Sequence, residues 1–287
     1  TLGGFAVSGG GFELRDAVAL LVDGPVSGGS VVLTDSATGA ALTVAGSVTG
    51  SSLVALAATS GTLGLSGIVD AGAGTLDLSS AGAIVQAGGR LSAAVLQSSG
   101  GVAGGVTLSS ATNAIGALGG FTVTGGPFLL TDSVSVSVGG VVAVDSGGTI
   151  ALSTDGFGFA AGGALNTGGG VVSLIPLSGT TVVTLGGAGS GIAAGDLSQI
   201  VAARISLGGA AGGGGTQAAA IDIVGNATTG AVLELHTTGT VLQSAGTLSV
   251  GSLEGNAFGI SIEQPGNVIP ALGVFTIGGG EFRLADS

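Results

Sequence analysis

The chain of 287 residues contains no cysteine, methionine, tryptophan or tyrosine, and it has four basic residues and one histidine. The lack of cysteine excludes a disulfide framework and a thiolate metal site. Sixteen acidic residues give a net charge of −12. This charge opposes binding to phosphate backbones and to anionic membranes, because basic side chains supply the attraction to both. We therefore expect no nucleic-acid partner.

Long apolar runs are also missing. Gly, Ser, Thr or Asp interrupts each apolar stretch well before the roughly 18 residues that a membrane-spanning helix needs. We therefore expect no membrane insertion. No signal peptide is recognisable, and the chain starts and stops inside copies of one repeated motif, so we expect it to be an excerpt of a longer protein.

The residues that are present predict short strands. Glycine accounts for 63 positions, and 45% of residues are apolar, in alternating runs such as Phe12-x-Leu14, Leu76-x-Leu78 and Leu233-x-Leu235. Period-two alternation bounded by Gly, Ser, Asp or Asn is typical of β-strands. Helix-forming residues are scarce, and glycine is too frequent for a helical interior. The sequence predicts an all-β protein.

A fifteen-residue motif occurs three times, at 2–16, 118–132 and 272–286. Its skeleton is L-G-x-F-x-[VI]-x-G-G-x-F-x-L-x-D. A second pattern, G-x-[IV]-[VL]-Q-x-x-G-x-L-S, occurs at 82–92 and 239–249, and N-x-I precedes the second and third copies of the motif. We expect a structural role in the repeat for Phe5, Phe12, Asp16, Gln86, Asn113, Phe121, Phe128, Asp132, Gln243, Asn267, Phe275, Phe282 and Asp286.

These landmarks divide the chain into super-repeats 2–117 and 118–271, with a partial third copy at 272–287. The two super-repeats differ in length by 38 residues, which is close to two solenoid coils of roughly 20 residues each. A solenoid accepts extra coils because each coil contacts only its neighbours. We therefore predict a parallel β-helix (β-solenoid) of roughly 20-residue coils, continuous over 1–287.

The order Q-x-x-G-x-[LI]-[ST], then N-x-I, A-L-G-x-F and G-G-x-F-x-L-x-D resembles the long repeats of filamentous-haemagglutinin-like proteins, the β-strand-repeat surface proteins of the two-partner-secretion type. The resemblance covers 82–132 and 239–286, and 1–16 as a partial copy. It implies a right-handed parallel β-helix, export from a Gram-negative bacterium, and a cell-surface role in adhesion or biofilm.

Candidate catalytic groups are few. His236 is the single histidine and stands where the earlier copy has Ser79, so we expect a solvated turn residue rather than a member of a catalytic triad. The carboxylate pairs Asp70/Asp77 and Glu254/Glu263 are the candidates for glycosidic chemistry. Because aromatic platforms and basic groups are scarce, we expect the chain not to be an enzyme.

We also expect no cofactor. Calcium bound in turns is the alternative, since acidic β-solenoids offer oxygen ligands there. The nonapeptide and D-x-D-x-D-G signatures of calcium-binding repeats are missing, however. A sufficient explanation for aspartates at corners is that their side chains hydrogen-bond the backbone of the turn. Such corner aspartates are Asp16, Asp35, Asp132 and Asp145.

Two glycine-rich segments are predicted to be loops. Gly208–Gly215 lacks the lysine and the strand-to-helix context of a phosphate-binding loop, so we expect a flexible loop that bulges from one coil. Gly156–Gly163 contains Phe157 and Phe159, which would form a contact patch if they were exposed.

The function that these observations favour is non-catalytic: a structural segment of a secreted surface filament or adhesin stalk, whose partners are copies of itself, end to end or as a continuous filament. The alternative is an adhesive module that binds host or bacterial glycans or proteins through protruding loops.

Overall fold

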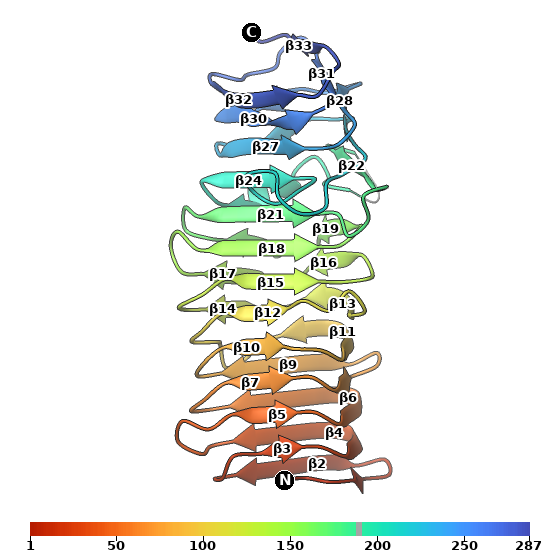
Figure 1. Cartoon of the computed structure of the whole chain (residues 1–287), viewed down its shortest axis with the longest axis vertical. Helices are drawn as coiled ribbons and strands as arrows, with labels where there is room; N and C mark the ends of the chain where they lie inside the picture. The colour runs from red at the N-terminus through yellow and green to blue at the C-terminus, as the bar shows by residue number, and fades with distance from the viewer. Residues whose placement is uncertain (188–190) are drawn as a thin grey trace. The chain divides into compact units, whose positions relative to one another are not determined.

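The computed structural model describes residues 1–187 and 191–287. It confirms the predicted fold class: the chain is all-β, with parallel strands stacked as a β-solenoid of about 13 turns (Figure 1). The coil length is about 22 residues, slightly longer than predicted. By internal contacts the chain divides into unit 1, Thr1–Asp145 with Ala161–Gly163, and unit 2, Ser146–Ala160 with Ala164–Ser287.

Strands of unit 1 lie in two long sheets and one short one. The first sheet has the order β1-β4-β6-β8-β11-β13-β16, with β2 paired to β4 and with β9 paired to β6 and β11; the second has the order β3-β5-β7-β10-β12-β15; and β14 pairs with β17. The bounds are β1 Phe5–Ala6, β2 Gly11–Asp16, β3 Leu21–Val22, β4 Pro25–Asp35, β5 Leu42–Val44, β6 Ser47–Ala58, β7 Leu63–Leu65, β8 Ile68–Asp70, β9 Thr75–Ser80, β10 Ile84–Gln86, β11 Arg90–Gln97, β12 Val106–Leu108, β13 Ala114–Leu118, β14 Phe121–Val123, β15 Phe128–Thr131, β16 Val136–Val138 and β17 Val141–Val144.

Unit 2 also has two long sheets, together with two short strand pairs. One sheet has the order β18-β21-β24-β27-β30-β32 and another the order β22-β25-β28-β31-β33, while β20 pairs with β23 and β26 with β29. The bounds are β18 Thr149–Ser153, β19 Phe157–Phe159, β20 Ala164–Asn166, β21 Val171–Ile175, β22 Val182–Leu185, β23 Ile200–Val201, β24 Arg204–Leu207, β25 Ala220–Ile223, β26 Ala227–Thr228, β27 Val232–His236, β28 Thr240–Gln243, β29 Leu248–Ser249, β30 Ser252–Ala257, β31 Gly259–Ile262, β32 Leu272–Ile277 and β33 Phe282–Leu284. A short 3-10 helix, Asp196–Gln199, precedes β23.

The core of each unit follows from the alternation along the strands. In β4, Val31 and Leu33 are fully buried and stack on Val54 and Leu56 of β6. Glycine recurs at the corners because neighbouring coils approach closely there. A Cβ at Gly61 would lie 1.5 Å from the carbonyl oxygen of Ala40 in the coil beside it. Such contacts leave room for glycine alone.

Copies of the fifteen-residue motif do not share a face of the solenoid. Within unit 1, β2 of the first copy pairs with β4 in the first sheet, whereas β15 of the second copy pairs with β12 in the second sheet. The cause is the spacing of 116 residues, because at about 22 residues per coil it corresponds to about five and a third coils. The motif therefore specifies a corner, and different corners of the same unit use it.

The extra length of the second super-repeat is not two whole coils. At about 22 residues per coil, 38 residues fall short of two coils. Part of the difference lies in long connections, from Leu185 at the end of β22 to Ile200 at the start of β23, and from Leu207 at the end of β24 to Ala220 at the start of β25. The second connection contains the glycine-rich segment and positions the polar cluster described below.

Candidate functional site

The two phenylalanines of each motif copy contact one another across a glycine-rich corner. Aromatic pairs at such separations contribute beyond the area that they bury. The ring centroids lie 4.6 Å apart for Phe5 and Phe12, 5.0 Å for Phe121 and Phe128, and 5.8 Å for Phe275 and Phe282. The middle pair is buried, with Phe121 1% and Phe128 0% exposed. In the middle copy, the motif thus builds an aromatic corner in the core.

Gln86 and Asn113 form a reciprocal amide pair at the end of three stacked strands of unit 1. Gln86 Nε2 donates to Asn113 Oδ1 at 2.8 Å, and Asn113 Nδ2 donates to Gln86 Oε1 at 2.9 Å. Asn113 also accepts the backbone N–H of Leu91 and donates to the carbonyl oxygen of Thr131. The amides therefore tie the coils of β10, β12 and β15 together.

Unit 2 repeats the same pair at the ends of β28, β31 and β33. Gln243 Nε2 donates to Asn267 Oδ1 at 2.8 Å, and Asn267 Nδ2 donates to Gln243 Oε1 at 2.9 Å. Asn267 accepts from the N–H of Leu248 and donates to the carbonyl oxygen of Ala285. Both amides are buried. The two units thus repeat these four hydrogen bonds.

The motif aspartates accept hydrogen bonds from backbone N–H groups, some of them 17 residues earlier in the chain and some two residues later. Asp132 accepts from Ile115 at 2.9 Å and from Val134 at 2.9 Å, and Asp286 accepts from Ile269 at 2.8 Å. Burial raises the pKa of Asp132 above its ordinary value, although the backbone hydrogen bonds act in the opposite direction. Desolvation dominates because the residue is 1% exposed.

Two predicted loops have different structures. Phe157 and Phe159 are the ends of strand β19 and are half-buried, so the expected protruding loop is wrong. The Phe-Gly-Phe alternation itself predicts a strand here, because a glycine in a short strand costs little compared with the gain from burying two rings.

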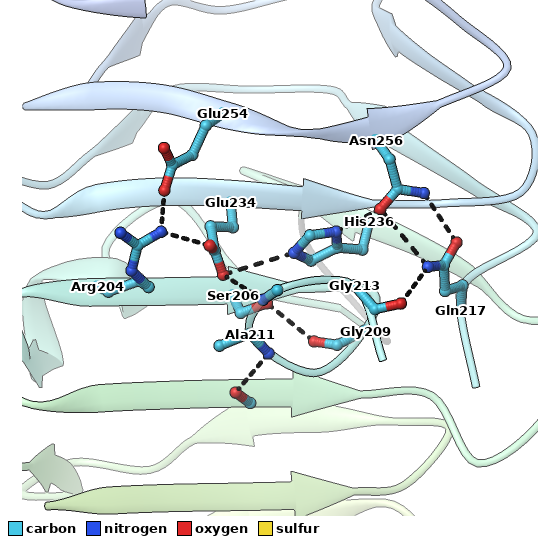
Figure 2. A network of polar contacts seen from close by, with 12 residues as sticks. Arg204, Ser206, Gly209, Ala211, Gly213, Gln217, Glu234, His236, Glu254 and Asn256 are labelled. Carbon is cyan, nitrogen blue, oxygen red and sulfur yellow. Dashed lines mark hydrogen bonds and ion pairs between the residues drawn. The ribbon is translucent and has the colours of Figure 1, made fainter. Parts of the chain in front are cut away.

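Gly208–Gly215 is irregular, as predicted, but it does not bulge freely. It lies on the outward side of β24 and β27 (Figure 2). The N–H of Ala211 donates to Ser173 Oγ, the hydroxyl of Ser206 donates to the carbonyl oxygen of Gly209, and Gln217 Nε2 donates to that of Gly213. Glycine is required at position 209, because a Cβ there would lie 2.8 Å from that of His236.

His236 is buried beneath this loop, which overturns the expectation of a solvated turn residue. It is the last residue of β27 and is 3% exposed. Its Nδ1 lies 2.5 Å from Asn256 Oδ1, and its Nε2 lies 3.5 Å from Glu234 Oε2. Because Asn256 Nδ2 donates to Gln217 Oε1 at 2.9 Å, Asn256 Oδ1 is the acceptor and His236 Nδ1 the donor.

Arg204 joins two carboxylates on the same surface. Its Nη1 donates to Oε1 of Glu234 and to Oε1 of Glu254, which belong to the adjacent strands β27 and β30 (Figure 2). Glu234 also accepts the N–H of Gly212 at 3.4 Å. The two carboxylates therefore share one guanidinium, and Glu234 also holds the loop.

The carboxylate pairs considered from the sequence have separate partners. Asp70 faces Arg90 at 4.0 Å, and Asp77 accepts from Gln97 Nε2 at 3.0 Å. Glu254 binds Arg204, whereas Glu263 is exposed and accepts from the hydroxyl of its neighbour Ser261. Glu234, which sequence reasoning did not select, is the carboxylate that meets Glu254.

Polar and apolar residues around this cluster leave a groove of about 250 Å³, bordered by Gly212, Glu234, His236, Glu254, Gly255, Asn256, Val274 and Thr276. A larger groove of about 730 Å³ in unit 1 is bordered by Ala, Gly, Ser, Thr and Val side chains. Those side chains include no acid, base or cation. Of these two grooves, only the one beside the polar cluster of unit 2 is therefore bordered by ionisable side chains.

Among the residues that the structure describes, no cluster of three or more His, Cys, Asp or Glu side chains is arranged to hold a metal ion. In the same part of the chain, no helix has the length and apolarity to cross a membrane. Comparison with protein-family models, with curated proteins and with solved structures finds no match.

Proposed function

We propose that the chain is a structural, non-catalytic segment of a secreted filament or adhesin stalk on the surface of a Gram-negative bacterium. Its partners would be copies of itself, end to end or as a continuous filament. Secretion and surface location rest on the resemblance of the Q-N-D landmarks to filamentous-haemagglutinin-like repeats. The mechanical role rests on the geometry of those landmarks.

One observation carries the proposal: the repeated motif occupies two different faces within unit 1. A recognition surface formed by repeats must present its copies to the same side, because a partner meets one side at a time. A structural corner has no such requirement. The motif copies are therefore suited to holding coils together rather than to forming a ligand array.

The polar side chains of the repeat also hold coils together. Gln86, Asn113 and Asp132 form hydrogen bonds with neighbouring coils, as Gln243 and Asn267 do in unit 2. Stability in a solenoid accumulates from such contacts between nearest neighbours. A segment built this way can extend coil by coil, because each added coil needs only its neighbours.

The test is surface labelling of intact cells of the natural source with antibodies against the purified chain. The proposal predicts labelling before permeabilisation, and loss of that labelling after brief protease treatment of whole cells. Labelling that requires permeabilisation would contradict it. An antibody against a cytoplasmic protein is the control for intact membranes.

The groove beside Glu234, His236 and Glu254 favours a second candidate, adhesive binding of a glycan or protein through the loop at 208–217. Val274 borders this groove and is 81% exposed. If the groove binds, Val274→Ser weakens adhesion, whereas Val18→Ser, at a position 71% exposed in unit 1, leaves it unchanged. Equal adhesion by both variants and by a loop-deleted chain would exclude this function.

A further inference from the structure

His236 has an oxygen atom beside each of its two ring nitrogens. Nδ1 lies 2.5 Å from Asn256 Oδ1, and Nε2 lies 3.5 Å from Glu234 Oε2 (Figure 2). His236 and Glu234 are both buried. A neutral imidazole has one N–H group and one lone pair. If both oxygens are acceptors, a neutral ring therefore satisfies only one of them.

Two backbone carbonyl groups fix the orientation of the amides beside the ring. Gln217 Nε2 donates to the carbonyl oxygen of Gly213 at 2.8 Å, which leaves Gln217 Oε1 to accept from Asn256 Nδ2 at 2.9 Å. Asn256 Nδ2 also donates to the carbonyl oxygen of Thr237 at 3.4 Å. Because a carbonyl group accepts and does not donate, turning either amide would set oxygen against oxygen. Asn256 thus presents an acceptor to His236 Nδ1.

Glu234 presents an acceptor to the other ring nitrogen. Its Oε1 accepts from Arg204, and its Oε2 accepts the N–H of Gly212 at 3.4 Å. A proton on Nε2 of His236 makes the contact with Glu234 an ion pair, whereas a lone pair there would face a carboxylate oxygen. The doubly protonated ring is therefore the form that satisfies both of its neighbours.

The glycine-rich loop lies against this ring and is held by the same cluster. A Cβ at Gly213 would lie 3.4 Å from His236 Nδ1, so the loop backbone passes directly over the imidazole. Gly212 donates to Glu234, and the carbonyl group of Gly213 accepts from Gln217. A change in the charge of the ring thus acts on the side chains that anchor the loop.

We infer that protonated His236 latches the glycine-rich loop closed, and that the loop opens as the pH rises and the ring releases its second proton. This conformational device goes beyond the proposed function and does not depend on it. The closed loop keeps a proton that the open loop releases, so a rise in pH favours opening. The transition is expected between about pH 5.5 and 8, the interval in which histidine changes charge in proteins.

The other charges of the cluster stay constant over this interval. Among the described residues, the charged groups around His236 are Glu234 on its own strand, Arg204 on β24 and Glu254 on β30. The loop, β21 and β32 contribute none. Carboxylates and guanidinium groups ordinarily titrate outside about pH 5.5–8. A transition in this range therefore belongs to the histidine.

The first test measures the charge of the ring. Because the chain has a single histidine, isotopically labelled histidine gives NMR signals from this ring alone. The inference predicts that both ring nitrogens carry a proton in most molecules at about pH 6.5, where a solvated histidine is half protonated. A ring that is neutral in most molecules at that pH overturns the inference.

The second test measures opening of the loop by hydrogen exchange. Exchange of the Ala211 and Gly212 amides, divided by the intrinsic rate at each pH, should increase about tenfold from about pH 5.5 to 8. His236→Gln keeps an amide donor but cannot titrate, so its corrected exchange should be the same at both pH values. Circular dichroism checks that this variant folds.

Two outcomes of the exchange experiment contradict the latch. The first is corrected exchange that stays constant or falls as the pH rises in the native chain. The second is an equal increase in His236→Gln, which would assign the opening to another group. If the variant does not fold, the NMR and exchange measurements on the native chain still decide the inference.

Discussion

Gln86 and Asn113, 27 residues apart in the chain, exchange two amide hydrogen bonds of 2.8 and 2.9 Å in the interior of the solenoid. Gln243 and Asn267 form the same pair in unit 2. A buried amide is costly without partners and specific with them. The pair therefore fixes which coil lies on which, a task that aliphatic side chains alone perform less selectively.

Asn113→Ala should destabilise the chain by about 3 kcal/mol, because it leaves the amide of Gln86 and the N–H of Leu91 buried without their acceptor. Equilibrium urea unfolding followed by circular dichroism measures the loss. Asn226→Ala is the control, since Asn226 accepts the N–H of Thr247 in an exposed hydrogen bond; it should cost about 1 kcal/mol. Equal losses would contradict the role of the buried pair.

Phe121→Ala should cost about 4 kcal/mol, since it opens a cavity where the ring is 1% exposed. Phe282→Ala in the last motif copy, at the position that corresponds to the buried Phe128, should cost about 1–2 kcal/mol, because that ring is 39% exposed. Thermal and urea unfolding measure the loss of stability in each variant, and so compare a buried ring with a partly exposed ring of the same motif. A larger loss at Phe282 would refute the burial argument.

Arg204→Gln should leave Glu234 and Glu254 facing one another and should loosen the loop at 208–217. We expect a loss of about 2 kcal/mol, less than for a fully buried pair because the arginine side chain is 35% exposed. Limited proteolysis should then cleave the loop faster. Arg90→Gln is the matched control: its contact with Asp70 is 4.0 Å long, and its loss should change stability by less than about 0.5 kcal/mol.

Asp132 should make a pH-dependent contribution that opposes folding above its ordinary pKa of 3.8, since burial raises its pKa in the folded state. Below that pH the group is protonated in both states and has no cost. As the pH rises, the unfolded chain releases its proton first, so stability falls until the folded group also ionises.

Comparison of the native chain with Asp132→Asn isolates this effect, because contributions shared by both proteins cancel. Urea unfolding at a series of pH values from about 3.5 upward should show the native chain losing stability relative to the variant as the pH rises above 3.8. A native chain that gains on the variant over this interval would mean that hydrogen bonds to the carboxylate outweigh its desolvation.

Much of the fold is predictable from the sequence because local periodicity specifies it. The alternation Phe12-x-Leu14 gives a strand, and the recurrence of the motif gives stacked coils. The contact between Gln86 and Asn113 could be inferred because both residues recur together at 243 and 267. The exact coil length could not be inferred, since the corners between strands differ in length.

Burial of Glu234 and His236 could not be predicted in this way. Alternation with Leu233 and Leu235 places both side chains on the outward side of β27, where solvent is the default. The cover comes from Gly208–Gly215, a segment of the preceding coil with no strand pattern to place it. The signal available was the concentration of charge at 204, 234 and 254 in a chain with 7% charged residues.

Cryo-electron microscopy of the natural material tests the central claim most directly. The account predicts long, thin fibres with an axial layer spacing of about 4.7–4.8 Å, the distance between stacked strands, and a mass per length equal to one coil of about 22 residues per layer. Discrete, compact particles without that spacing would contradict a structural filament and would favour the binding function.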